Sequence, residues 1–133
     1  MGAIFMTQML NEPPLGTRVL IVDDEELICW SLKQRLVDEG YISYTAGTKE
    51  EAKVLVEKHR FTHLITDLKL IECTGFDIID MVREKLPDIH VVMLTAFGGE
   101  ANRIKAEQKG VELFQIKPIQ FEETLEYLHA TAH

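Results

Sequence analysis

The alternation of short apolar runs with helix-period segments constrains the fold of this chain more than any other feature. Five runs rich in β-branched and aliphatic residues occupy 18–22, 41–45, 62–66, 89–94 and 112–116. Between and after them, apolar residues recur at helical spacing, as in Ile28, Leu32 and Leu36, in Ala52, Leu55 and Val56, and in Phe121, Leu125 and Leu128. This alternation predicts an α/β fold: a parallel sheet covered by helices on both faces and joined by right-handed crossovers.

Local signals refine this expectation. The runs 19–22 and 91–94 are apolar throughout, which favours central strands that are buried on both sides. Thr48 followed by Glu51 predicts a capping box at the start of the second helix. The fourth helical segment, 98–108, is the weakest, because only Ala101, Ile104 and Ala106 are apolar. We therefore expect a weakly anchored helix there.

The length of 133 residues suits one domain with one core, and 46% apolar with 27% charged residues is typical of a folded globular protein. An apolar cluster near the start is broken by Asn11, Pro13 and Pro14 and lacks the basic region of a signal peptide. We predict a flexible N-terminal tail over 1–17 and a single domain over 18–130.

The charge balance argues against several partners. A net charge of −8 should repel nucleic acid and anionic membranes, and no run of 18 apolar residues predicts a membrane span. The two cysteines, Cys29 and Cys73, lie far apart and form no C-x-x-C pair. We therefore interpret them as reduced thiols of a cytoplasmic protein.

Polar residues follow four of the five predicted strands directly. Asp23, Asp24 and Glu25 follow the first strand, Asp67 the third, Thr95 the fourth and Lys117 the fifth. Because ligands of open α/β sheets bind at the carboxyl ends of the strands, we expect these side chains to meet at one edge. Carboxylates without histidine or cysteine suit Mg²⁺ better than Zn²⁺. A carboxylate can attack a phosphoryl group once cations neutralise the charge on the transferring oxygens.

Each of these residues also has a simpler explanation. Asp23 and Asp24 could be helix N-caps, Asp67 could stabilise a turn, Thr95 could be an ordinary strand end, and Lys117 could be solvated. The functional interpretation therefore depends on the combination of residues at the strand ends.

The same residues lie in motifs that resemble the receiver domain of two-component response regulators, over about 18–129. The matching motifs are I-V-D-D-E at 21–25, L-I-T-D-L at 64–68, M-L-T-A-F-G at 93–98 and Q-I-K-P-I at 115–119. The resemblance implies a flavodoxin-like, doubly wound (βα)5 fold with strand order 2-1-3-4-5. The motifs are also similar to receivers joined to transcriptional activators of the enhancer-binding type.

The resemblance also implies a role for each motif residue. Asp67 corresponds to the phosphoacceptor, and Asp23 and Asp24 to the acidic pair that binds Mg²⁺, with Asp24 as the direct ligand. The backbone carbonyl of Lys69 corresponds to a further metal ligand.

Four other positions match residues of the family. Lys117 corresponds to the phosphoryl-binding lysine, and Pro118 to the cis proline that follows it. Thr95 corresponds to the switch hydroxyl and Phe114 to the switch aromatic.

Three positions depart from the family pattern or vary within it. Ile71 stands where receivers usually carry proline, so we expect a more flexible loop after Asp67. Lys69 and Phe97 occupy two variable positions that influence the lifetime of the acyl phosphate. We predict that Phe97 excludes water and that Lys69 lends charge to the phosphoryl group.

The sequence thus predicts a Mg²⁺-dependent signalling receiver that is phosphorylated on Asp67 by a histidine kinase or a phosphotransfer protein. We expect no enzymatic activity beyond self-phosphorylation and slow self-dephosphorylation. The fourth helix, fifth strand and fifth helix should form the surface for an output domain or effector, or for a phosphorylation-linked homodimer. Two alternatives remain open: a phosphorylation-independent interaction module and an aspartyl phosphohydrolase. Lys69 argues against the phosphohydrolase, because such enzymes usually carry a second acidic residue at that position.

Overall fold

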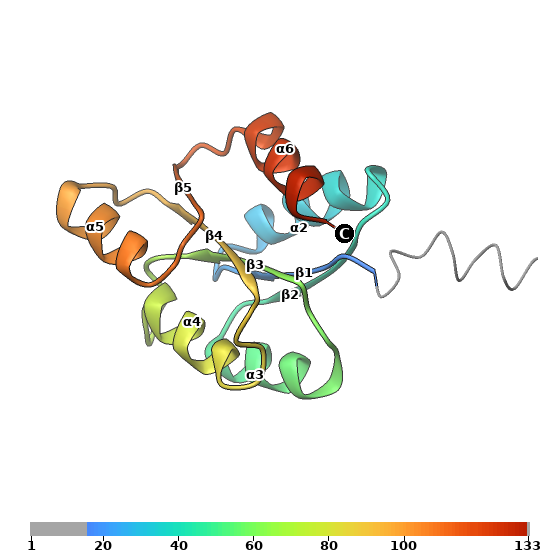
Figure 1. The fold of residues 1–133 in the computed structure, drawn as a ribbon, viewed down its shortest axis with the longest axis horizontal. Coiled ribbons are helices and arrows are strands. Elements are labelled where there is room, and N and C mark those ends of the chain that lie inside the picture. Colours follow the sequence, from blue (N-terminus) through green and yellow to red (C-terminus); the bar gives the residue numbers. More distant parts are fainter. Residues whose placement is uncertain (1–15, 133) are drawn as a thin grey trace, which may run out of the picture.

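Strands and helices alternate along residues 16–132, the part of the chain that the computed structural model describes (Figure 1). The elements are, in order, β1 (Arg18–Val22), α2 (Glu26–Asp38), β2 (Ile42–Ala46), α3 (Lys49–Lys58), β3 (His63–Asp67), α4 (Gly75–Arg83), β4 (His90–Thr95), α5 (Glu100–Gln108), β5 (Leu113–Ile116) and α6 (Phe121–Thr131). Each predicted strand is confirmed to within about one residue at either end.

The five strands form one parallel sheet in the order β2-β1-β3-β4-β5. This order confirms the flavodoxin-like, doubly wound fold that the sequence resemblance implies. The strand order reverses beside β1, and neighbouring strands end within one residue of the same level: Val22 pairs with Thr66, the residue before the end of β3, and Thr95 pairs with Ile116. The carboxyl ends of the strands therefore meet at one edge of the sheet, which we call the carboxyl-end rim.

Alternate residues of each central strand supply two separate cores. In β1, Leu20 and Val22 pack with residues of α3, α4 and α5, whereas Val19 and Ile21 pack with residues of α2 and α6. Figure 1 shows this division, with α2 and α6 on one side of the sheet and α3 and α4 on the other. Burial on both faces explains why these strands are apolar throughout.

The helix starts differ in detail from the sequence prediction. The Thr48 hydroxyl accepts the Glu51 N–H (3.1 Å) as predicted, but the Glu51 carboxylate accepts the N–H of Gly47 rather than that of Thr48. The expected capping box at α3 is therefore only half formed. A complete box opens α4, where Thr74 and Asp77 bond to one another in both directions.

Helix α5 is shorter than predicted and has few apolar contacts. It begins at Glu100, because Gly99 adopts a φ of 111°, a conformation that glycine tolerates and other residues avoid. Its one buried residue is Ala106. Its C-terminal end is held by α4, where Arg83 donates to the carbonyls of Lys109 and Gly110. Polar contacts thus replace much of the usual apolar anchoring.

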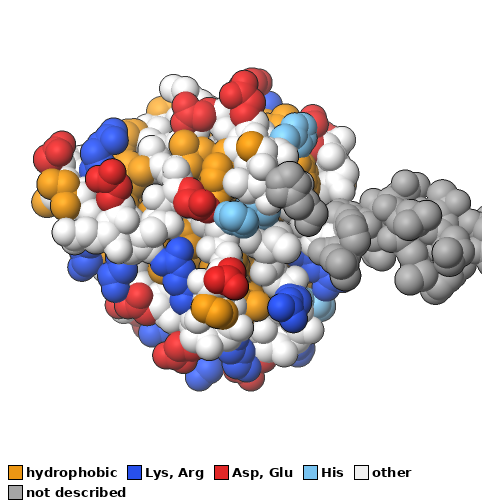
Figure 2. Space-filling view, in the orientation of Figure 1, with side chains coloured by type: hydrophobic (Ala, Val, Ile, Leu, Met, Phe, Trp, Pro, Cys, Tyr) orange, Lys and Arg blue, Asp and Glu red, His pale blue; other side chains and the backbone are white. Residues whose placement is uncertain are grey.

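The charged residues that cover the fold are of both signs. Figure 2 shows acidic and basic side chains interspersed over one face of the molecule. No helix of the described residues is long and apolar enough to cross a membrane. The predicted tail lies outside the described residues up to position 15, and Gly16 and Thr17 are buried where the chain enters β1.

One buried polar atom offers a test of the packing. The Ser43 hydroxyl on β2 is buried and has no hydrogen-bond partner among the described residues. A buried hydroxyl without a partner loses its hydration without compensation. We expect Ser43→Ala to raise the free energy of unfolding by about 1 kcal/mol in urea denaturation. A loss of stability would show that the hydroxyl is bonded in solution.

Candidate functional site

The polar residues predicted from the sequence meet at the carboxyl-end rim. Asp23 follows β1, and Asp67 and Thr95 are the last residues of β3 and β4. Lys117 follows β5, and its backbone N–H donates to the carbonyl of Thr95 (2.8 Å). The parallel strand order therefore brings residues separated by up to 94 positions into one pocket.

The Lys117 ammonium group lies at the centre of this pocket. Its Nζ donates to Asp23 Oδ2 (2.9 Å), to Glu25 Oε1 (3.0 Å) and to Asp67 Oδ2 (3.0 Å). An ammonium group has three protons, so all of its donors are used. Asp23 and Asp67 are almost fully buried, whereas Glu25 is 59% exposed. One internal cation thus holds three carboxylates from two strand ends.

Burial and charge act in opposite directions on these groups. Burial raises the pKa of Asp23, and the hydrogen bonds from the Glu25 N–H and from Lys117 offset this only in part. Burial disfavours the charge on Lys117, but the hydrogen bonds to the three carboxylates together raise the pKa of this ammonium above its ordinary value. Lys117 is therefore firmly charged.

The three carboxylates also form a group that suits a hard cation. Oxygen atoms of Asp23, Glu25 and Asp67 all lie within 4.8 Å of one another. Three carboxylates surround a single ammonium group, so the pocket carries an excess of negative charge. Oxygen ligands and excess negative charge fit Mg²⁺.

Two predicted metal ligands lie differently from the carboxylate group. Asp24 is half-buried beside Asp23 but is not one of the three converging carboxylates. Lys69 donates its backbone N–H to Asp67 Oδ1 (3.3 Å), and its ammonium lies 4.5 Å from the centre of the Phe97 ring. Lys69 and Phe97 are therefore in contact, which their separation in the sequence did not indicate.

The two predicted switch residues share one face of the sheet. Thr95 is fully buried, and its hydroxyl accepts the N–H of Phe97 (2.9 Å). Because the hydroxyl accepts this bond, its own proton remains available to a new acceptor. Phe114 lies on β5 in register with Met93 and packs against the core on the α4 side of the sheet, as Met93 does. The peptide bond between Lys117 and Pro118 is cis, as the resemblance implies.

The loop after Asp67 is held by hydrogen bonds in the absence of proline at position 71. Leu70 N–H donates to the carbonyl of Cys73 (3.1 Å), and Gly75 N–H donates to the carbonyl of Leu68 (2.7 Å). Ile71 itself is 80% exposed at the tip of this turn. The capping box of α4 follows directly, so the loop is bonded at both ends.

The sequence assigned no role to two residues that the structure places at the pocket. Glu25 was expected at the same edge of the sheet but was given no role in the site, although its position directly after Asp24 was a usable signal. Cys29 donates its Sγ–H to the backbone carbonyl of Asp23 (3.2 Å), and burial raises the pKa of this thiol to about 11. This contact forms because the first turn of α2 brings Cys29 back over the end of β1, which the spacing of residues did not indicate.

Fold and site together place the chain in a known class. The family model of the response regulator receiver domain matches residues 19–129, so the chain belongs to the receiver domain family, whose members are generally signalling modules rather than enzymes.

Individual relatives agree with this assignment. The chain is 34% identical over 101 residues to the alginate biosynthesis transcriptional regulatory protein AlgB of Pseudomonas aeruginosa. The matched residues cover 76% of this chain and 22% of AlgB. The beryllofluoride-activated NtrC4 receiver domain dimer is 35% identical, with a TM-score of 0.80 over 86% of this chain and 95% of that one. TrrA from Thermotoga maritima, solved with Mg²⁺ and beryllofluoride, is 28% identical, with a TM-score of 0.75 over 86% and 98% of the two chains. The chain thus spans about a fifth of the length of AlgB.

The close approach of α4 to Asp67 gives a testable consequence. A Cβ atom at Gly75 would collide with the carbonyl oxygen of Asp67 and lie 3.0 Å from Met93 Cε. We expect Gly75→Ala to displace the Asp67 backbone and to lower the free energy of unfolding by about 1–3 kcal/mol in urea denaturation.

Gly47→Ala is the matched control, because a Cβ there meets Glu51 at an ordinary distance of 3.4 Å. Equal losses of stability in the two variants would contradict the importance of the contact between Gly75 and Asp67.

Proposed function

We propose that this chain is a phosphorylation-dependent signalling receiver that accepts a phosphoryl group on Asp67 from a histidine kinase or a phosphotransfer protein. The observation that carries the proposal is the buried Asp67 carboxylate, held with Asp23 and Glu25 around the Lys117 ammonium in a chain of the receiver family. Burying carboxylates with an excess of negative charge costs stability, and this cost favours a functional explanation for them.

The acidic pocket supports Mg²⁺ as the cofactor. Asp23 and Asp67 are the buried carboxylates that would hold it, together with Asp24 and the backbone carbonyl of Lys69 as the family resemblance implies, and Glu25 is the further candidate that the geometry adds. Mg²⁺ would supply positive charge to the transferring phosphoryl oxygens.

Asp67 provides the nucleophile. One carboxylate oxygen of Asp67 attacks the phosphorus atom, the new P–O bond forms as the bond to the donor breaks, and the donor leaves with the electron pair. Asp67 Oδ1 is oriented by the Lys69 N–H and Oδ2 by Lys117. Lys117 can transfer one of its three hydrogen bonds to the phosphoryl group and stay charged throughout.

Thr95 can read the presence of the phosphoryl group. Its hydroxyl proton is free to bond a phosphoryl oxygen, which would draw Thr95 towards Asp67 and leave space for Phe114 on the same face of the sheet. Helix α5 would follow most easily, because it buries a single residue. The α5–β5–α6 surface, with exposed Ile104 and Ile116, is the proposed output surface.

The relatives indicate what that output could be. AlgB is a transcriptional regulatory protein, and the activated NtrC4 receiver is a dimer. We therefore propose that phosphorylation regulates an output such as transcription, through a homodimer or a contact with an effector on the α5–β5–α6 surface. The net charge of −8 argues against direct DNA binding by this domain.

The central prediction is a single phosphoryl adduct on Asp67. Incubation with acetyl phosphate and Mg²⁺ should add one phosphoryl mass to the intact protein, and omission of Mg²⁺ should abolish the adduct. Asp67→Asn removes the nucleophile and should remove the adduct, whereas Asp88→Asn makes the same chemical change at an exposed site and should not. An adduct that survives in Asp67→Asn, or no adduct with any donor, would sink the proposal.

The same assay separates the alternatives. A phosphorylation-independent interaction module would give no adduct, and a phosphohydrolase would turn over acetyl phosphate without accumulating a phosphoprotein. A stable adduct distinguishes a receiver from both.

The contact between Lys69 and Phe97 predicts the lifetime of the phosphoform. Phe97 is predicted to exclude water from the phosphoryl group, and the Lys69 ammonium lies on the face of its ring. Lys69→Ala and Phe97→Ala should therefore each speed dephosphorylation by about two- to fivefold, as expected for a cation–π contact of about 0.5–1 kcal/mol. Because the two groups act together, the double variant should show less than the product of the single effects. Lys53→Ala, at an exposed position of α3, is the control. Unchanged dephosphorylation rates in both single variants would refute the role of Lys69 and Phe97 in the lifetime of the phosphoform.

A further inference from the structure

The end of the sheet opposite the carboxyl-end rim contains a buried histidine that the proposed signalling mechanism does not use. His63, the first residue of β3, is fully buried, although it is ionisable. It lies on the wall of a hollow of about 370 Å³ that Thr17, Phe61, Leu86 and His90 also line. A buried ionisable group costs stability when it becomes charged, so burial favours the neutral form of His63.

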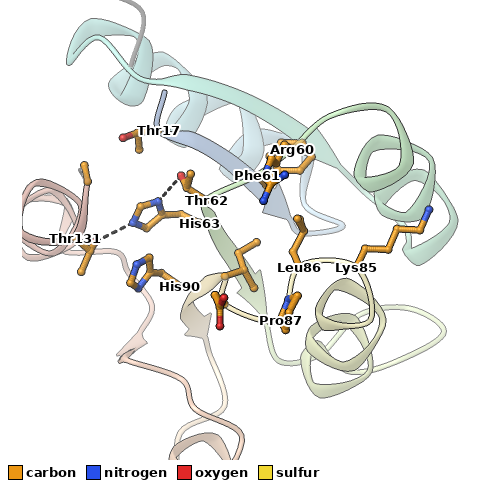
Figure 3. Close-up of a pocket in the computed structure, with 13 residues that line it drawn as sticks. Thr17, Arg60, Phe61, Thr62, His63, Lys85, Leu86, Pro87, His90 and Thr131 are labelled. Atoms are coloured by element: carbon orange, nitrogen blue, oxygen red, sulfur yellow. Dashed lines mark hydrogen bonds between the residues drawn. The ribbon is translucent and has the colours of Figure 1, made fainter. Parts of the chain in front are cut away.

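Both nitrogens of the His63 ring are bonded to threonine hydroxyls. Nδ1 lies 2.8 Å from Thr62 Oγ1, and Nε2 lies 2.8 Å from Thr131 Oγ1 (Figure 3). The Thr131 hydroxyl donates to the carbonyl of Tyr127 (2.8 Å), so it accepts from a protonated Nε2 of His63. A neutral ring then accepts at Nδ1 from the Thr62 hydroxyl, so both ring nitrogens have hydrogen-bond partners.

The contact between His63 and Thr131 ties the start of β3 to the last residue of α6. Tyr127, one turn earlier on α6, lies edge-on to the His63 ring with centroids 6.0 Å apart. The last turn of α6 therefore covers the Nε2 side of His63, and movement of this turn away from the sheet would expose that side of the ring to water.

The groups around His63 make its protonation unfavourable in the closed state. The ring of His90 stacks on the His63 ring with centroids 4.9 Å apart, and, in addition to burial, its charge lowers the pKa of His63. Glu112 is the nearby opposing charge, but it is bonded to His90 (2.7 Å) and to the Tyr127 hydroxyl. The other charged groups that line the hollow are Arg60, Lys85 and Asp88.

We propose that His63 and the last turn of α6 form a proton-operated latch, which is closed when His63 is neutral and opens when His63 is protonated. Protonation of Nδ1 turns an acceptor into a donor, and the Thr62 hydroxyl can answer by donating to the carbonyl of Arg18 (3.1 Å) instead. The hydrogen bonds are therefore kept, and the buried charge beside His90 is what favours opening. The latch works without phosphorylation, and only its link to the output surface depends on the function proposed above.

The sign of the pH dependence follows from the two states. Burial first, and then His90, lower the pKa of His63 from its ordinary value of 6.5 to about 4 in the closed state. The latch is fully stable above pH 6.5 and loses stability as the pH falls towards 4, because the open state takes up the proton first. Between pH 7.5 and pH 5.5 the opening equilibrium constant should rise about tenfold.

Hydrogen exchange in the last turn of α6 tests the latch. The Ala132 amide, which donates to the carbonyl of Leu128 (2.8 Å), reports opening after correction for intrinsic exchange rates. In the unaltered protein its opening constant should rise about tenfold from pH 7.5 to pH 5.5, and in His63→Gln by less than about twofold. His129→Gln, an exposed position on the same helix, is the control and should behave as the unaltered protein does. An equal rise in His63→Gln overturns the latch.

Two further measurements distinguish a failure of the latch from poor folding of the variant and from a failure of Asp67 phosphorylation. Titration of the His63 ring by NMR in the unaltered protein should give a midpoint near 4, and a midpoint near 6.5 overturns the latch even where His63→Gln folds poorly. Phosphorylation of His63→Gln by acetyl phosphate should equal that of the unaltered protein, so a failure of the latch and a failure of Asp67 phosphorylation are seen in different experiments.

Discussion

The arrangement of the carboxyl-end rim depends on one interaction, the pairing of the Lys117 ammonium with carboxylates that follow two other strands. Each carboxylate at this edge would be costly to bury without an opposite charge. The ammonium neutralises part of this charge and connects β5 to β1 and β3, two of the strands on the other side of β4. The remaining negative charge is what makes the pocket suitable for a divalent cation.

The rest of the fold can be understood as support for that pairing. Burial on both faces holds β1, β3 and β4 in register, so the positions of Asp23, Asp67 and Thr95 do not depend on flexible loops. Gly75 lets α4 approach the backbone of Asp67 closely. In contrast, α5 has little apolar contact and is held by hydrogen bonds at one end. A rigid site beside a loosely packed helix is a suitable arrangement for converting a local charge change into a movement.

The two ends of the sheet carry ionisable groups for different physical reasons. At the carboxyl-end rim, charged groups are buried together and stabilise one another. At the opposite end, His63 is buried in its neutral form, with hydroxyl partners and with His90 stacked on it. The arrangement at the carboxyl-end rim suits the binding of a cation, whereas the arrangement around His63 suits a response to protonation. Both contact the α5–β5–α6 side of the molecule, the first through Thr95 and Phe114 and the second through Thr131.

The sequence alone determined the fold class, the strands to within about one residue, and the residues that meet at the rim, because parallel strands place their carboxyl ends together whatever their side chains are. The motifs around Asp23, Asp67, Thr95 and Lys117 were sufficient to name the family. Tertiary structure alone decided that Glu25 joins the pocket while Asp24 stands beside it, that Lys69 lies on Phe97, and that His63 bonds Thr131 across 68 positions. Those contacts depend on side-chain direction and on how α2 and α6 pack on the sheet, and neither is encoded in the spacing of residues along one strand or helix.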